Sequence, residues 1–149
     1  MDEPHNNPNE HTSPADPFQP HFDSDASRSE RTYAMWIHLG ALIGWVVAGA
    51  SQGIGAWLPI VVAGVMWTAR KKDSPFIDDH GREALNFQIS MILMFLLALV
   101  VGLMMCLVGV AVTLPAVMVL AVAGSIMGAV AASKGQYFRY PATFRFLKG

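Results

Sequence analysis

Two long windows of the sequence carry no formal charge. Asp, Glu, Lys and Arg are absent from Thr32 to Ala69 and again from Ala84 to Ser133, stretches of 38 and 50 residues. A charged side chain near the centre of a bilayer costs roughly 2.5–3.5 kcal/mol on insertion scales. Windows of this length without a single charge predict membrane spans, and we therefore expect an all-α integral membrane protein.

The first window is too long for one span. A helix rises about 1.5 Å per residue and the hydrocarbon core is about 30 Å thick, so roughly 20 residues suffice to cross it. The stretch from Gly49 to Gly55 holds three glycines and two polar side chains, which favours a turn. We predict two short helices, at about 33–50 and 56–70. Thinning of the bilayer or a partly re-entrant hairpin is the alternative to two full spans.

The second window must also fold back, because one helix of this length would be about 75 Å long. Gly109, Thr113 and Pro115 are the helix-breaking residues near its middle. They predict helices at about 83–108 and 114–134, with the turn uncertain by several residues. The expected fold therefore has four transmembrane helices in two hairpins, with both termini on the same side.

The bases indicate which side that is. All of them lie before the first window, between the windows or after the second: Arg28, Arg31, Arg70, Lys71, Lys72, Arg82, Lys134, Arg139, Arg145 and Lys148. The positive-inside rule then predicts that both termini and the 71–82 loop face the cytoplasm, in the cell inner membrane. Bases that flank a membrane suit anionic lipid head groups rather than nucleic acid. We expect such lipid contacts at Arg70, Lys71, Lys72 and Lys148.

The ends of the chain differ from the windows in composition. Residues 1–30 contain five prolines and seven acidic residues with few large apolar groups, and are expected to be a disordered tail. Residues 31–149 would then form the membrane domain. Its last part, 135–149, alternates aromatic and basic residues as interfacial segments do. In that part Arg139 or Arg145 could pair with a carboxylate of the middle loop, at Asp78, Asp79 or Glu83.

The middle loop and the start of the third helix form the densest polar segment. Asp78 and Asp79 are expected to cap that helix, with Glu83 in its first turn. A metal site built from Asp79, His80 and Glu83, with His38, lacks a recognised ligand spacing. No nucleophile–base pair or phosphate-binding glycine loop is present either. We therefore assign no enzymatic activity, catalytic residue, metal or cofactor.

Three polar residues inside the windows are candidates for a specific role. The amides of Asn86 and Gln88 need hydrogen-bond partners at that depth, and could either bond a neighbouring helix or line a wet cavity. His38, about one turn inside the first span, is either a neutral histidine near the interface or a functional group.

Small residues spaced four apart occur in the first and fourth helices. They are Gly40, Gly44 and Ala48, and Gly124, Gly128 and Ala132. Such spacing lets helix backbones approach closely in lipid. It predicts packing within one bundle, or self-association through one of these faces.

Several of these polar residues belong to a longer pattern. Pro75-Phe76-Ile77-Asp78, His80 to Gln88 and Gly135-Gln136-Tyr137-x-Arg139-Tyr140-Pro141-x-x-x-Arg145 resemble an uncharacterised family of four-helix bacterial membrane proteins. That family is similar to the Tic-twenty-like proteins, whose chloroplast relatives belong to the inner-envelope import machinery. The resemblance marks a candidate interaction motif: Pro75, Phe76, Asp78, Asp79, His80, Glu83, Asn86, Gln88, Tyr137, Arg139, Tyr140, Pro141 and Arg145.

Two functions follow as expectations. The first is a non-enzymatic scaffold, assembly or interaction protein of the membrane, with other membrane proteins as partners. The second, implied by the import relatives, is a transport or protein-translocation component. A single bundle of four short helices has too little interior for a pore, so the second function requires a homo-oligomer.

Overall fold

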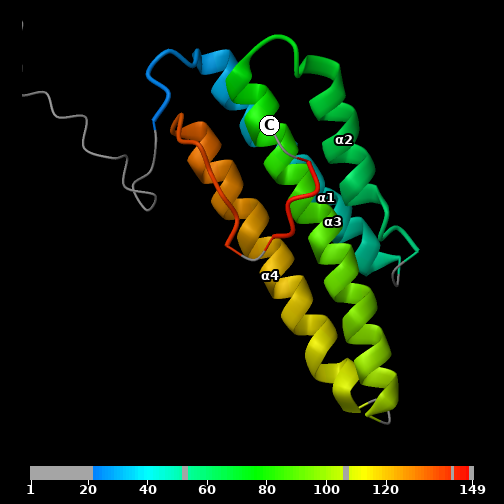
Figure 1. Ribbon diagram of the computed structural model, residues 1–149. Coiled ribbons are helices and arrows are strands. Elements are labelled where there is room, and N and C mark those ends of the chain that lie inside the picture. Colours follow the sequence, from blue (N-terminus) through cyan, green and yellow to red (C-terminus); the bar gives the residue numbers. More distant parts are fainter. Residues whose placement is uncertain (1–21, 52–53, 106–107, 142, 148–149) are drawn as a thin grey trace, which may run out of the picture.

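Four helices form the protein. The computed structural model describes residues 22–51, 54–105, 108–141 and 143–147. In order they are α1 (Arg28–Ala50), α2 (Leu58–Arg70), α3 (Pro75–Met104) and α4 (Val108–Ser133). The all-helical prediction with four helices in two hairpins is confirmed (Figure 1). The helices α1, α3 and α4 pack against one another, while α2 packs against α1 and α3.

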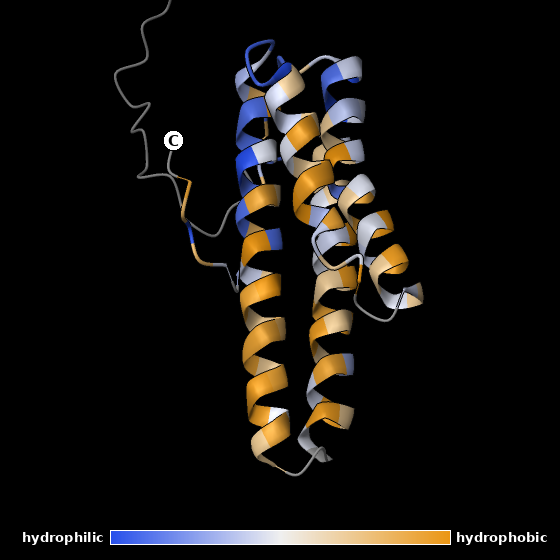
Figure 2. Cartoon of the chain, turned by 90° about the vertical axis from the view of Figure 1, so that its right-hand side faces the viewer, coloured by the Kyte–Doolittle hydropathy of each residue, from blue (hydrophilic) through white to orange (hydrophobic). Residues whose placement is uncertain are grey.

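One end of the bundle is polar. The starts of α1 and α3 and the ends of α2 and α4 meet there (Figure 1). Figure 2 shows hydrophilic residues gathered at this end and apolar residues over most of the remaining helix length. We call it the polar end.

The helices differ in length. α1, α3 and α4 are long and apolar enough to cross a membrane, whereas α2 has 13 residues. At about 1.5 Å per residue α2 measures roughly 20 Å, which is less than a hydrocarbon core of about 30 Å. The α3–α4 hairpin accordingly extends beyond the α1–α2 turn (Figure 1). The structure therefore has three candidate spans and one short apolar helix, and the alternative of a first hairpin that does not span fully stays open.

The long hairpin exposes apolar side chains. Large residues of α3 and α4 that point outward include Leu97, Val100, Leu103, Val112 and Val119. A contiguous apolar surface of this kind is unfavourable in water and suits lipid acyl chains. The exposure therefore agrees with the composition in identifying a membrane protein.

The first helix begins earlier than expected. Ser27 is its N-cap, and a reciprocal capping box with Glu30 satisfies backbone groups at the start. Before it, Asp23 N–H donates to the Gly135 carbonyl at 2.8 Å, and Phe22 forms an isolated bridge with Gln136. The expected disordered tail is therefore wrong for residues 22–30. Residues 1–21 lie outside the described residues.

The third helix also begins earlier. Ser74 is the N-cap and its hydroxyl accepts the Phe76 N–H at 3.2 Å, while Pro75 occupies the first turn. Proline is tolerated there because its missing N–H would have no helical partner. The helix thus starts at Pro75 rather than at residue 83. Asp78 and Asp79 lie within it, so the prediction that they cap it is wrong.

The turn between α3 and α4 is shorter than expected. It lies between Met104 and Val108, so Thr113 and Pro115 fall inside α4. A Cβ on Gly109 would lie 3.0 Å from the Gly102 Cα, which shows how closely the two backbones approach. This close approach permits a short turn, which lies a few residues before the approximate position of 108–114 that we expected.

The two sets of small residues serve packing inside the bundle. A Cβ on Gly44 would lie 2.8 Å from the Pro59 nitrogen, so α1 and α2 touch backbone to backbone there. A Cβ on Gly124 would overlap the Phe87 ring of α3. These faces are thus occupied within one chain, as the packing interpretation predicts, and self-association through them stays a prediction.

Candidate functional site

The segment that follows α4 folds back along the helices instead of continuing as a helix. Residues 136–147, here called the C-terminal segment, run from the polar end along α4 and then cross to α3 (Figure 1). Tyr140 is buried, while Phe144 and Phe146 point outward. We expected this segment to lie along the membrane interface; in the structure it packs against the bundle.

A chain of hydrogen bonds links three buried side chains to the C-terminal segment. His80 Nε2 lies 2.9 Å from the Gln136 carbonyl oxygen, and His80 Nδ1 lies 3.1 Å from His38 Nε2. His38 Nδ1 lies 2.7 Å from the hydroxyl oxygen of Tyr140. His38 and His80 have no exposed surface, and Tyr140 is 4% exposed. The chain therefore ties α1 and α3 to the C-terminal segment at two points.

The partners determine which atom donates in each bond. A carbonyl oxygen only accepts, so the hydrogen between His80 and Gln136 is on His80 Nε2. A neutral His80 then offers Nδ1 as an acceptor for His38 Nε2–H, which leaves His38 Nδ1 to accept the Tyr140 O–H. A proton added to His80 would make Nδ1 a donor, so His38 would have to change tautomer and would no longer accept the Tyr140 O–H. With both histidines neutral, this single pair of tautomers satisfies all three hydrogen bonds.

Two arginines of the C-terminal segment face carboxylates of α3. Arg139 forms two hydrogen bonds with the Asp79 carboxylate, at 2.6 and 2.7 Å, and these raise the pKa of its guanidinium. Glu83, which is nearly buried, lies 3.6 Å from Arg139 Nε and 3.5 Å from Arg145 Nε. The predicted pairing is thus present for Asp79 and Glu83. For Asp78 it is wrong.

Asp78 serves a different contact. Its carboxylate accepts the indole N–H of Trp67 at 2.8 Å and pairs with Arg82 at 3.3 Å. It therefore joins α3 to the end of α2. Directly beside it, a Cβ on Gly81 would overlap the Trp67 ring, so the two helices are in close contact there.

Asn86 and Ser90 hold the far part of the C-terminal segment. Asn86 Oδ1 accepts the N–H groups of Phe146 and Leu147 at 3.1 and 2.8 Å, and its Nδ2 donates to the Leu147 carbonyl at 3.0 Å. Ser90 Oγ accepts the Phe144 N–H at 2.9 Å. These bonds satisfy backbone groups of a segment that has no regular structure, as an apolar environment demands.

Gln88 joins two helices. Its Oε1 accepts the indole N–H of Trp45 at 2.7 Å, so it links α3 to α1. For both amides, bonding to a neighbouring part of the chain is what the structure shows, rather than the alternative of a wet cavity.

Replacing Asn86 with leucine should release the end of the C-terminal segment, because three backbone groups would lose their partners at about 1–3 kcal/mol each. Limited trypsin digestion in detergent, followed by mass spectrometry, should show faster cleavage after Arg145. Gln88→Leu is the matched control, since it breaks only the bond to Trp45. Equal cleavage rates in the two variants would contradict the assignment.

Aromatic side chains complete the polar end. Phe76 is buried, with its ring centroid 4.5 Å from that of His80 and 5.4 Å from that of Tyr137. Tyr137 donates its hydroxyl to the Asp23 carboxylate at 2.9 Å, and burial together with this contact raises its pKa to about 12. Pro75 and Pro141 are exposed and lie at the start of α3 and within the C-terminal segment.

The bases expected to contact lipid lie at the edge of the polar end. Arg70 pairs with Asp73 at 3.0 Å, the Lys71 ammonium lies 4.7 Å from the Trp67 ring centroid, and Lys72 is exposed. Lys148 falls outside the described residues. Contact of these bases with lipid stays a prediction.

Sequence reasoning missed several residues of this site. Ser90 is one turn beyond Asn86 on the same face of α3, and its polarity in an apolar run was the signal. Gly128 was noticed only for helix packing, although a Cβ there would overlap the Tyr140 hydroxyl and the His38 ring. Asp23 lies in a stretch whose composition suggested disorder.

The described residues contain no group of three or more His, Cys, Asp and Glu side chains that could hold a metal ion. The combination of Asp79, His80 and Glu83 is not brought together. Both ring nitrogens of His80 are used by His38 and Gln136, whereas Asp79 and Glu83 face Arg139. Although Asp79, His80 and Glu83 are close in the sequence, the histidine and the two carboxylates therefore have different partners.

The fold and this network define a small multi-pass helical membrane protein whose polar side chains are concentrated at one end. The family model of the magnetosome magnetite crystal formation proteins matches residues 29–147, and the chain belongs to that family. No curated protein and no solved structure matches it. The resemblance to the Tic-twenty-like proteins is therefore wrong: the match covers the motifs that suggested it and assigns them to a different family.

Proposed function

We propose that this protein acts in magnetite crystal formation as a non-enzymatic component of the magnetosome membrane. The observation that carries the proposal is the family match over residues 29–147, which covers the whole helical bundle. The import relatives were the reason for expecting a role in protein translocation. That expectation is dropped together with the resemblance.

The chemistry of the polar end supports an interaction role. Its carboxylates are neutralised by arginines, as in Asp79 with Arg139, rather than gathered around an open position where a substrate or metal could react. Such pairs fix the shape of a surface without activating a nucleophile. We infer that this end, on the cytoplasmic side, binds other membrane proteins or further copies of the chain.

A transport role for a single copy has less support. The interior between α1, α3 and α4 is filled by Trp45, Phe87, Met91 and Tyr140, which pack as one cluster. Any path would have to form between copies. The scaffold function is therefore the one that the geometry favours.

A deletion strain tests the proposal. In a magnetite-forming bacterium that carries this gene, its removal should reduce the size or number of crystals seen by electron microscopy, and the wild-type gene should restore them. Crystals of unchanged size and number in the deletion strain would contradict the proposal.

Crosslinking tests whether the polar end is the surface of contact. Lys72 is exposed at this end, so a lysine-reactive crosslinker added to native membranes should join it to a partner. Lys72→Arg keeps the charge and removes the amine, and should abolish the crosslinked peptide that contains Lys72, whereas crosslinks through Lys71 and Lys134 should persist. A homo-oligomer and a heterologous partner would be distinguished by mass spectrometry of the product.

A further inference from the structure

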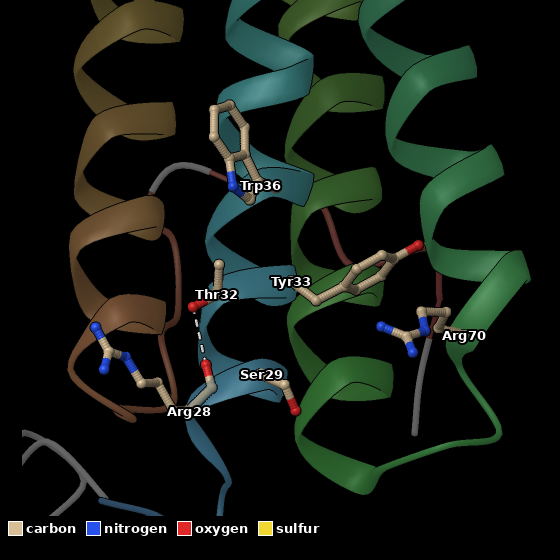
Figure 3. A pocket seen from close by; sticks show the side chains of 6 residues that line it. All are labelled: Arg28, Ser29, Thr32, Tyr33, Trp36 and Arg70. Carbon is tan, nitrogen blue, oxygen red and sulfur yellow. Dashed lines mark hydrogen bonds between the residues drawn. The ribbon is translucent and has the colours of Figure 1, made fainter.

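A recess lies between the start of α1 and the end of α2 at the polar end. It measures about 560 Å³ and is lined by Arg28, Ser29, Thr32, Tyr33, Trp36 and Arg70. Figure 3 shows Arg70 beside Tyr33 on the α2 side, the Arg28 side chain extending from α1 toward α4, Ser29 between them and Trp36 further along α1. The lining thus holds two cations, three hydroxyl groups and two aromatic rings, without an acidic side chain.

The wall formed by Arg70 is fixed in place. Tyr33 donates its hydroxyl to the Met66 carbonyl at 2.8 Å, which joins α1 to α2. The Arg70 guanidinium carbon lies 4.9 Å from the Tyr33 ring centroid, and its Nε lies 3.0 Å from the Asp73 carboxylate. Nε is the Arg70 atom that pairs with Asp73, and the planar guanidinium has further N–H groups with which it can donate to an anion.

The second cation is exposed. Arg28 forms no ion pair within the described part of the chain, and its neighbour Ser29 is exposed as well. Arg28 therefore adds a positive charge at the rim of the recess.

The order of groups along the recess matches the order of groups in a phospholipid. Arg28 comes just before the charge-free window and Arg70 just after it, as is typical of bases that contact head-group phosphates. Tyr33 and then Trp36, which is 48% exposed, follow toward the apolar part of α1. Aromatic rings at this level pack against the region between head groups and acyl chains.

We propose that this recess is a binding site for one anionic phospholipid, whose phosphate is held by Arg70 beside Tyr33, with Arg28 adding positive charge at its rim, and whose acyl chains run along Trp36. The site is separate from the His38–His80–Tyr140 chain and does not depend on the proposed role in crystal formation. It gives the short helix α2 a function in fixing how the bundle sits in the bilayer.

Tryptophan quenching tests the site. The full-length protein is reconstituted into phosphatidylcholine vesicles that contain either dibrominated phosphatidylglycerol or dibrominated phosphatidylcholine. The signal of Trp36 is obtained as the difference between the wild type and Trp36→Phe. Brominated phosphatidylglycerol should quench Trp36 at a several-fold lower mole fraction than brominated phosphatidylcholine. Equal quenching by the two lipids would overturn the proposal.

Arginine variants test whether Arg70 and Arg28 cause the preference for the anionic lipid. Arg70→Gln and Arg28→Gln should each weaken the preference for the anionic lipid about fivefold, the factor that corresponds to about 1 kcal/mol per base at a membrane surface. The Arg70–Asp73 pair is exposed, so its loss should leave the fold intact, as gel filtration can verify. Arg28→Gln breaks no ion pair and gives a second, independent readout.

Two controls complete the experiment. Lys134→Gln removes the same charge from the same end, at an exposed residue that does not line the recess, and should change the preference little. An equal loss in this variant would assign the preference to diffuse electrostatics and overturn the site. Loss of the preference on adding inorganic phosphate would show that the site takes a free anion, and would overturn the lipid assignment.

Discussion

Replacing Gly128 with alanine is expected to displace the C-terminal segment and lower the stability of the protein. The added Cβ would overlap both the Tyr140 hydroxyl and the His38 ring. Neither neighbour can move freely, because both are buried and hydrogen-bonded to each other. Overpacking of this kind costs about 1–3 kcal/mol, and the loss of the His38–Tyr140 bond adds to it.

The matched control is Gly64→Ala in α2. The nearest side-chain atom to its added Cβ, Leu85 Cδ1, is 3.8 Å away, which is an ordinary contact. This variant should be neutral or more stable by about 0.5–1 kcal/mol, because alanine favours a helix over glycine. Reversible unfolding in mixed detergent would give both values. Equal stability of Gly128→Ala and the wild type would contradict the packing described here.

A second substitution tests whether Gly128→Ala loses stability because its methyl group overlaps the Tyr140 hydroxyl. Tyr140→Phe removes the hydroxyl that the new methyl group of Gly128→Ala meets, and keeps the ring that stacks on Phe87 with centroids 4.0 Å apart. The double variant should therefore recover part of the stability that Gly128→Ala loses. Alone, Tyr140→Phe should cost about 1–3 kcal/mol because His38 Nδ1 loses its donor.

Removing both Arg139 and Arg145 is expected to destabilise the protein by more than the sum of the single changes. Either arginine alone leaves Glu83 with one cation, whereas the double change leaves a nearly buried carboxylate with none. An uncompensated buried charge is costly, so we expect a coupling of about 1 kcal/mol or more between Arg139→Gln and Arg145→Gln. Arg139→Gln should be the more damaging single change because it also leaves Asp79 unpaired.

The Glu83→Gln background provides the control. Without that carboxylate the two arginine changes share no partner, and their effects on the free energy of unfolding should add within about 0.5 kcal/mol. Coupling that persists in this background would show that Glu83 is not the group joining them. Additivity in the wild-type background would contradict the ion-pair geometry.

Sequence reasoning found the elements of the fold but misplaced their ends. The third helix starts at Pro75 because Ser74 caps it, a signal that the sequence contains and that the run of acids after it obscured. Pro115 was expected to lie near the turn between two helices, yet it lies inside α4. The short turn depends on the approach of Gly102 and Gly109, which is a property of two packed helices.

For the site as well, some contacts could be anticipated from the sequence and others could not. Because the C-terminal segment and the middle loop were predicted at one end, the pairing of Arg139 with Asp79 could be anticipated. The hydrogen bonds of His38 with His80 and Tyr140 could not, since they join residues 42 and 102 positions apart. They exist because the C-terminal segment folds back between the helices. The motif residues were recognised as a group, although the family assigned to them was wrong.

The sequence by itself determined that the chain resides in a membrane and that its charged groups lie outside the two windows. Both follow from the cost of burying a charge in lipid, which each residue incurs whatever its neighbours are. Only the tertiary structure decided which polar groups meet, how the C-terminal segment is held and that α2 is short. Hydrogen bonds and ion pairs depend on direction and on distances of about 3 Å, and packing alone brings distant residues to such positions.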